Sequence, residues 1–371
     1  MGPSLGGLLR RHFLAAGLGM STGSLRATGP ASLSKHRALQ FPRDLGSHPD
    51  HRIEWWYLTG HLTADARSDN PPGRDEFGFQ LTFFRSRVDA TQGMTSAFAA
   101  KQLIFAHAAV TDVKGKKLHH DQRIAREGFD VAQASRQDTA ITLRDWSLVR
   151  GASGYQAVAS GPEFGFDLNL VETQALLLQG QQGFSRKGPD EQQASFYYSL
   201  PQLQVAGKLT LGNRQIPVKG SAWFDHEWSQ ALLHPEAVGW DWIGMNLLDG
   251  SALTAFRLRN KAGQALWDGG SFRHPSMGAK PHIFSPGEVV FQATRSWTSP
   301  LTRAVYPVEW VVRTPADFYT VKAVIDNQEL DSRQSTGAIY WEGLSELFDS
   351  QGRLVGRGYL EMTGYASQLR L

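Results

Sequence analysis

Apolar and polar residues alternate with a period of two along much of the chain from about residue 51 onwards. In the segment FGFQLTFFRSR, apolar side chains fall at Phe77, Phe79, Leu81 and Phe83. This spacing predicts an antiparallel strand with one buried face, because successive side chains of a strand point to opposite sides of the sheet. The Pro-Pro-Gly sequence at 71–73 predicts a hairpin turn between this strand and the WWYLTGHLTA segment before it.

Further segments of the same kind follow, among them TAITLRDWSLVRG, YQAVASG, FGFDLNLVE and KLTLGNRQIPVKGSAWF. Helical periodicity is weak throughout the chain. Short strands at regular spacing with few short helices are typical of barrels and sandwiches. The pattern therefore predicts an all-β protein.

An internal repeat is visible in the alternating segments. YYSLPQLQVAGKLTLGNRQIPVKGSAWFD, from Tyr197, parallels YWEGLSELFDSQGRLVGRGYLE, from Tyr340, and each ends with an aromatic residue two positions before an acid, Asp225 or Glu361. The openings EWWYLTGHL and WDWIGMNLL also match in their tryptophans and in the alternation that follows. A repeat on this scale predicts two similar units, although chance similarity between hairpins is the alternative.

The repeat places one β unit at about 45–230 and a second at about 236–371. Before them, the opening LLRRHFLAAGLGM sets Arg10 and Arg11 directly before a short apolar run. This arrangement predicts a twin-arginine secretion signal and linker over residues 1–35, and hence a protein of the periplasm or cell envelope. The alternative is the basic N-terminal arm of a cytosolic protein. An apolar run of about ten residues is too short to cross a bilayer, so we expect no transmembrane segment.

Composition narrows the classes of function. The 371 residues carry a formal charge of +3, spread without charged runs, so we do not expect nucleic acid as a partner. The chain has no cysteine, which excludes disulfides, thiolate metal sites and cysteine nucleophiles. Its 12 histidines form no group with metal-ligand spacing, and we expect neither a metal nor an organic cofactor. Eleven tryptophans favour aromatic-lined interiors that suit large apolar ligands.

The stretch SAWFDHEWSQALLHPEAVGWDWIGMNLLDG combines ionisable groups with large aromatic rings. On an extended strand Asp225 and Glu227 share one face, and His226 points to the other. Buried carboxylates beside Trp223 and Trp228 need hydrogen-bonding or cationic partners, or else a raised pKa. Two interpretations stay open, a network that braces the junction between the units and an acid held protonated for proton transfer.

The EWWYLTGHL strand sends Trp56 and Leu58 to one side and Trp55 and Tyr57 to the other. Such a strand serves either as core or as the lining of a ligand cavity. A closed barrel of about eight strands leaves either a packed interior or room for one small apolar ligand. Burial of large rings is the main source of stability in a small β fold, so the sequence favours the core interpretation of this strand.

Six segments together resemble one known family: HRIEWWYLTGHL, FGFQLTFFR, FAHAAVTD, GSAWFDHEW, GWDWIGMNLLDGSAL and GRGYLEMTGY. In this order they are similar to the AttH/CrtC lipocalin-like family, which includes carotenoid 1,2-hydratases (hydroxyneurosporene synthases) and exported proteins of unassigned role. The resemblance spans nearly everything after about residue 40. It implies a tandem of two lipocalin-like (calycin-type) antiparallel β-barrel domains with an elongated apolar cavity.

For function, the resemblance implies two alternatives. The first is an exported protein that binds a hydrophobic lipid or isoprenoid and serves as an auxiliary of an ABC-transporter permease. The second is a cofactor-free hydratase that protonates a terminal isoprenoid double bond and adds water to the resulting cation. In that chemistry Asp225 is the expected proton donor, with Asp241 second, and tryptophan faces at 223, 240 and 242 stabilise the cation.

The sequence thus nominates two groups of site residues. The candidate catalytic residues are Asp225, Asp241, Glu227 and His226. The candidate ligand-binding residues are Trp55, Trp56, Tyr57, Trp223, Trp228, Trp240 and Trp242.

Overall fold

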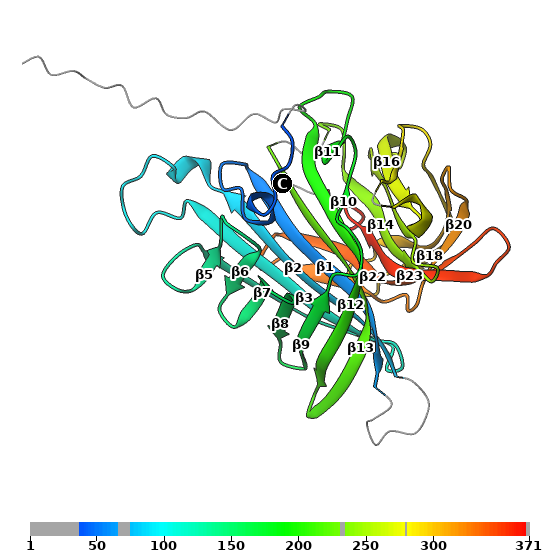
Figure 1. Ribbon diagram of the computed structural model, residues 1–371, viewed down its shortest axis with the longest axis horizontal. Helices are drawn as coiled ribbons and strands as arrows, with labels where there is room; N and C mark the ends of the chain where they lie inside the picture. Colours follow the sequence, from blue (N-terminus) through cyan, green and yellow to red (C-terminus); the bar gives the residue numbers. More distant parts are fainter. Residues whose placement is uncertain (1–36, 66–74, 231–233, 279, 369–371) are drawn as a thin grey trace, which may run out of the picture.

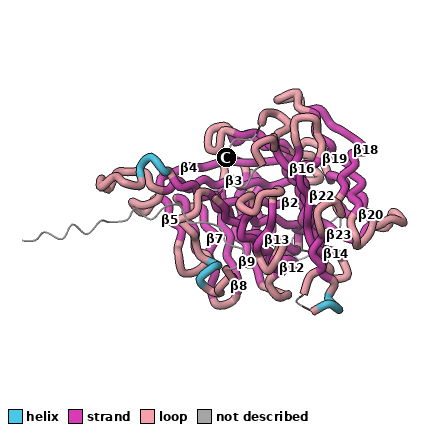
Figure 2. The backbone as a smooth tube through the Cα atoms, turned by 90° about the horizontal axis from the view of Figure 1, so that it is seen from above, coloured by secondary structure: helices cyan, strands magenta, loops and turns pink. Residues whose placement is uncertain are grey.

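The computed structural model describes residues 37–65, 75–230, 234–278 and 280–368. Almost all regular structure is antiparallel strand, arranged in two large sheets that lie side by side (Figures 1 and 2). The all-β prediction is therefore confirmed. The predicted secretion signal and the Pro-Pro-Gly turn at 71–73 lie outside the described residues. Within the described ranges, no helix has the length and hydropathy needed to cross a bilayer.

Helical structure is limited to short 3-10 turns in the described part of the chain. They are η1 (Arg43–Leu45), η2 (Asp89–Thr91) and η3 (Pro275–Met277).

The first sheet contains thirteen strands in the order β4-β3-β2-β1-β13-β12-β9-β8-β7-β6-β5, with β10 and β11 also paired to β12. Their bounds are β1 Ile53–Ala64, β2 Glu76–Arg87, β3 Gln102–Asp112, β4 Lys117–Arg126, β5 Ala132–Ala134, β6 Ala140–Leu143, β7 Trp146–Gly151, β8 Gly154–Ser160, β9 Phe164–Val171, β10 Leu177–Leu178, β11 Phe184–Arg186, β12 Ala194–Leu211 and β13 Arg214–Ser229.

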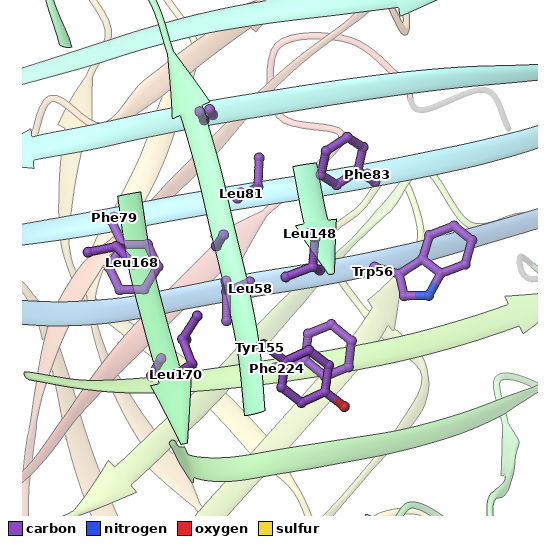
Figure 3. Close-up of a cluster of buried hydrophobic side chains, with 14 of the residues drawn as sticks. Trp56, Leu58, Phe79, Leu81, Phe83, Leu148, Tyr155, Leu168, Leu170 and Phe224 are labelled. Carbon is purple, nitrogen blue, oxygen red and sulfur yellow. The ribbon is translucent and has the colours of Figure 1, made fainter. Parts of the chain in front are cut away.

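This sheet curls into a nearly closed barrel, because β3 and β4 return to lie beside β6. Its interior is filled by side chains from both halves of the curl, and Figure 3 shows the green strands that carry Leu148, Tyr155 and Leu168 crossing the blue strands that carry Leu58 and Leu81. All five side chains are buried. The barrel therefore has a packed hydrophobic interior.

The second sheet contains ten strands in the order β17-β16-β15-β14-β23-β22-β20-β19-β18, with β21 paired to β22. Their bounds are β14 Gly239–Leu247, β15 Ala252–Arg259, β16 Ala265–Arg273, β17 His282–Phe284, β18 Val290–Thr298, β19 Val305–Arg313, β20 Phe318–Ala323, β21 Glu329–Ser332, β22 Ala338–Phe348 and β23 Leu354–Met362.

The two halves of the predicted repeat occupy equivalent places in the two sheets. In the first, the β12-β13 hairpin closes onto β1, and in the second, the β22-β23 hairpin closes onto β14. Each sheet falls inside one of the two units expected at 45–230 and 236–371. The matching acids, Asp225 and Glu361, both lie on the closing strand of their sheet.

The two sheets meet through a separate hydrophobic cluster. It contains Tyr57 and Trp223 from the first sheet and Trp242, Phe256 and Leu344 from the second, all buried. Gly78 on β2 also lies at this contact, where an added Cβ would stand 2.5 Å from the Tyr359 hydroxyl and 3.0 Å from Leu344 Cβ. The strands of the two sheets are therefore close-packed here.

Candidate functional site

A cavity of about 250 Å³ lies between the two sheets, outside the packed interior of the barrel. Strands β1, β2, β3, β12 and β13 form one wall, and β14, β15, β22 and β23 form the other. Figure 1 shows β1, β12, β14 and β22 close together in the middle of the molecule. Its size is close to the lower end of small-molecule pockets, about 300–1,000 Å³. The ionisable and aromatic side chains of the walls are Glu54, Trp55, Tyr57, Phe84, Arg85, Phe105, His107, Lys187, Tyr197, Asp225, Glu227, Trp240, Trp242, Phe256, Tyr340, Glu342 and Glu361.

The alternation of β1 decides which aromatic rings face the cavity. Trp55 and Tyr57 line it, whereas Trp56 and Leu58 point into the barrel core. The predicted division of this strand into two faces is confirmed. One face of β1 packs in the barrel core, and the other face lines the cavity. The core interpretation therefore holds for Trp56 and Leu58, and the ligand-cavity interpretation for Trp55 and Tyr57.

Asp225 lies on β13 in the cavity wall and is almost fully buried. Its Oδ1 accepts hydrogen bonds from Ser199 Oγ at 2.5 Å and Trp223 Nε1 at 2.7 Å, and its Oδ2 accepts one from Tyr197 Oη at 2.8 Å. Burial raises the pKa of Asp225 to about 7 and outweighs these three hydrogen bonds, which favour the ionised form. The carboxyl can therefore hold or release a proton near neutral pH.

Glu227 lies two residues further along the same wall. Its Oε1 accepts a hydrogen bond from Ser195 Oγ and lies 3.1 Å from Lys187 Nζ. Lys187 is itself buried, with its ammonium 4.9 Å from the ring centroid of Tyr197 and 4.2 Å from that of Phe256. Glu227 therefore lies beside Asp225 as half of an ion pair, in which Lys187 compensates its negative charge. The faces of Tyr197 and Phe256 further stabilise the ammonium.

The opposite wall carries a second pair of carboxyl groups. Glu361 on β23 lies directly opposite Glu342 on β22 in the strand register. Glu361 accepts a hydrogen bond from Trp240 Nε1 at 3.0 Å, and Glu342 accepts one from Gln80 Nε2 at 2.5 Å. Burial raises the pKa of Glu361 to about 7, and burial together with repulsion from Glu361 raises the pKa of Glu342 well above its ordinary value. The cavity therefore has a titrating acid on each wall.

Asp241 does not line the cavity. Its buried carboxylate accepts hydrogen bonds from Arg257 Nε at 2.7 Å and Tyr365 Oη at 2.8 Å, and Arg259 Nε lies 3.3 Å away. This is the geometry of a compensated structural acid. We therefore leave Asp241 out of the proposed chemistry.

Four other nominated residues also lie off the cavity wall. His226 and Trp56 point into the barrel, where their rings stack with centroids 4.8 Å apart. Trp228 stacks on His48 at 3.7 Å on the same side. Trp223 lies in the contact between the sheets, where its indole N–H serves Asp225. The other nominees, Trp55, Tyr57, Trp240, Trp242, Asp225 and Glu227, all line the cavity.

His226 belongs to a buried polar cluster with His48 and Glu54, the one group with metal-ligand spacing in the described ranges. Of its three members, Glu54 also borders the cavity. Glu54 Oε1 lies 2.7 Å from His48 Nδ1 and 2.9 Å from His226 Nε2, and Glu54 Oε2 accepts a hydrogen bond from Arg85 Nε at 2.8 Å. Tyr198 Oη also lies 3.0 Å from His226 Nδ1. A guanidinium bonded to the carboxylate fits a hydrogen-bonded brace rather than a metal centre.

Residues 32–365 match the family model described as AttH-like. The chain belongs to the AttH-like family. A solved structure of an AttH-type protein from Nitrosomonas europaea is 44% identical, with a TM-score of 0.82 over 90% of this chain and 99% of that one. The AttH part of the resemblance and the lipocalin-like fold are thus confirmed.

A more distant AttH-like fold occurs in kievitone hydratase from Nectria haematococca, which is 12% identical with a TM-score of 0.67 over 91% of this chain and 98% of that one. At this identity the similarity concerns the fold. Comparison with curated proteins gives no significant match.

Sequence reasoning missed several cavity residues of this AttH-like chain. Glu361 was visible in the repeat as the counterpart of Asp225, and that correspondence was the signal available for it. Glu342 lies in the same repeat segment, where no acid stands at the matching position of the first copy, and Lys187 lies outside the repeat. His107, which reads as an ordinary core histidine, lines the cavity, and its Nδ1 lies 2.8 Å from Tyr340 Oη across the sheet boundary. Burial lowers the pKa of His107 to about 3, which keeps the ring neutral.

Proposed function

We propose that this AttH-like protein is a cofactor-free hydro-lyase that adds water to a carbon–carbon double bond of a hydrophobic, isoprenoid-type substrate bound between the two sheets. The observation that carries the proposal is Asp225, a buried carboxyl with a pKa of about 7 in the wall of an aromatic cavity. An acid that stays protonated near neutral pH inside an apolar site can protonate an otherwise unreactive alkene.

In the proposed reaction, the Asp225 carboxyl gives its proton to the less substituted carbon of the double bond. The π electrons form the new C–H bond, and the other carbon becomes a tertiary cation. Aromatic faces in the wall, such as Trp55 and Trp242, stabilise this positive charge. Water then adds its oxygen to the cation, and the proton that it loses passes to a carboxylate, either Asp225 or Glu227.

The hydrogen bonds around Asp225 also fit the ionised state that it reaches after it has given up its proton. Ser199, Tyr197 and Trp223 all donate to it, so the carboxylate that remains after proton transfer is stabilised at once. Lys187 holds the negative charge of Glu227 next to it. The fold is also compatible with hydration chemistry, since a hydratase has it, although this relation concerns the fold alone.

The second candidate is a carrier that binds a lipid or isoprenoid without turnover. One observation favours it: every oxygen of Asp225 is already hydrogen-bonded, as expected of a brace. An apolar cavity between sheets serves a carrier as well as an enzyme. For this candidate we further propose export by the twin-arginine route and an auxiliary role for an ABC-transporter permease. Cell fractionation tests the export, and co-purification of a permease tests the auxiliary role.

The experiment that separates the two uses water labelled with oxygen-18. The purified protein is incubated with isoprenoid alkenes and alcohols in labelled water, and the products are analysed by mass spectrometry. The hydro-lyase predicts an alcohol that carries the label and is absent from incubations with Asp225→Asn. The carrier predicts that the compounds bind and are recovered unchanged.

A further inference from the structure

Two polar atoms in the cavity wall stand without a hydrogen-bond partner among the described residues. They are the hydroxyl oxygen of Tyr57 and the Oε1 atom of Glu342. Both residues line the cavity, and their side chains are only 6% and 2% exposed. Buried polar atoms are rarely left unpaired, because each costs about 1–3 kcal/mol.

The two atoms act on the same part of the cavity from opposite sheets. Tyr57 comes from β1 and Glu342 from β22, and each influences the ionisation of the other. The Tyr57 hydroxyl and the Glu342 carboxyl face each other closely enough to interact, but neither Tyr57 Oη nor Glu342 Oε1 meets the full geometry of a hydrogen bond. Gln80 occupies the other Glu342 oxygen at 2.5 Å, and the Tyr57 ring packs edge-on against Trp242 with centroids 5.3 Å apart. Both groups are therefore fixed in position, with one free atom each.

We propose that the ligand of this cavity carries a hydroxyl group that binds between Tyr57 and Glu342. The natural substrate is then an isoprenoid alcohol rather than a pure hydrocarbon. This inference rests on the proposed function for the identity of the reacting group, the double bond near Asp225. Tyr57 pairs with Asp225 in the strand register, so the hydroxyl anchor and the acid lie next to each other on the same wall.

The chemistry of the two free atoms selects a hydroxyl over other polar groups. The Tyr57 O–H needs an acceptor, which an ammonium group lacks. A ketone or an ether only accepts, so it leaves Glu342 unsatisfied whenever that carboxyl is ionised. A hydroxyl accepts from Tyr57 and pairs with Glu342 in either protonation state, because it can both donate and accept.

The test compares two compounds of the same carbon skeleton. Geraniol has an isoprenoid double bond and a hydroxyl, and 2,6-dimethylocta-2,6-diene has hydrogen in place of the hydroxyl. Dissociation constants are measured by quenching of tryptophan fluorescence, since Trp55, Trp240 and Trp242 line the cavity. For each variant, the dissociation constant of the hydrocarbon is divided by the dissociation constant of geraniol. This ratio is then compared between variants, so that the different water solubilities of the two compounds cancel.

Tyr57→Phe should lower this ratio about tenfold, because it removes one hydrogen bond to the alcohol. The variant should fold normally, since the deleted hydroxyl makes no hydrogen bond of full geometry and loses only its contact with the Glu342 carboxyl. Tyr155→Phe is the matched control: its hydroxyl is also buried and makes no hydrogen bond of full geometry, but it lies on β8 in the barrel core, beside Thr139. The ratio should stay unchanged there. Glu342→Leu provides a second variant with the same expected fall.

A ratio that is unchanged in both Tyr57→Phe and Glu342→Leu would overturn the hydroxyl anchor, as would tighter binding of geranylamine than of geraniol. Absence of binding by either compound would overturn both the anchor and the proposed cavity function. The two proposals remain separable in all other cases. Hydration with an unchanged ratio removes the anchor alone, and a lowered ratio without hydration removes the hydro-lyase alone.

Discussion

Asp225 and Glu361 occupy equivalent positions in the two sheets and face one cavity from opposite walls. In the strand register, Asp225 lies between Tyr57 and Ser199, as Glu361 lies between Trp242 and Glu342. Burial raises the pKa of both acids to about 7. The repeat in the sequence thus becomes, in the folded protein, a cavity with a titrating acid on each side.

The first prediction concerns the pH dependence of turnover. If protonated Asp225 is the proton donor, hydration should fall as the pH rises through about 7, where this carboxyl loses its proton. The measurement is kcat/KM between pH 5 and 9. In Glu361→Gln the descending limb should persist, because Asp225 is still present. Loss of the limb in Glu361→Gln would instead identify Glu361 as the donor.

The second prediction concerns stability and uses the same carboxyl. The pKa of Asp225 is higher in the folded chain, about 7, than its ordinary value of 3.8, so the native state binds the proton more tightly. Its contribution to stability is present in full at low pH and is lost as the pH rises through about 7. The free energy of unfolding of Asp225→Asn, relative to wild type, should therefore rise between pH 5 and 8, by about 2–3 kcal/mol. Urea unfolding at several pH values measures this, and a difference independent of pH would contradict it.

The third prediction concerns Asp241, which we regard as a structural acid. Asp241→Ala should destabilise the protein by about 3–5 kcal/mol, because it leaves the buried Arg259 and the half-buried Arg257 without their carboxylate. Asp167→Ala, a change at an exposed position of β9, should stay within about 0.5 kcal/mol of wild type. Denaturant unfolding of both variants provides the comparison. A small effect at Asp241 with lost turnover would return it to the list of catalytic candidates.

The fold was largely accessible from the sequence. Alternation placed Trp56 and Trp55 on opposite faces of β1, and Asp225 and Glu227 on one face of β13, because the direction of side chains in a strand depends only on local geometry. The repeat similarly marked Glu361. These features need no knowledge of what covers each face.

The location of the cavity could not be predicted from the sequence. Period-two alternation cannot tell which face of a strand meets the barrel core and which meets the second sheet, so it left open where a ligand would bind. Glu342 enters the site because two sheets distant in sequence dock there, and Lys187 enters because the segment after β11 folds back beside Glu227. Asp241 was nominated for its neighbouring tryptophans, but its arginine partners come from the next strand, β15, and are defined by pairing.

The fourth prediction concerns the buried ion pair of Lys187 and Glu227. Lys187→Met should destabilise the protein by about 3–5 kcal/mol, since Glu227 is then buried without a cation. The double variant Lys187→Met with Glu227→Gln should recover most of this loss, because neither charge remains. A double-mutant cycle of unfolding free energies measures the coupling. If the two single effects simply add, the pair is not a stabilising unit.

The measurement that tests the central claim most directly is a comparison of binding and turnover in Asp225→Asn with geraniol, the diene and oxygen-18 water. Protonation is needed only in the transition state, so the variant should bind these compounds within about threefold of wild type while hydration falls by at least about a thousandfold. Hydration that continues at the wild-type rate in a folded Asp225→Asn protein would contradict the assignment of Asp225 as the proton donor.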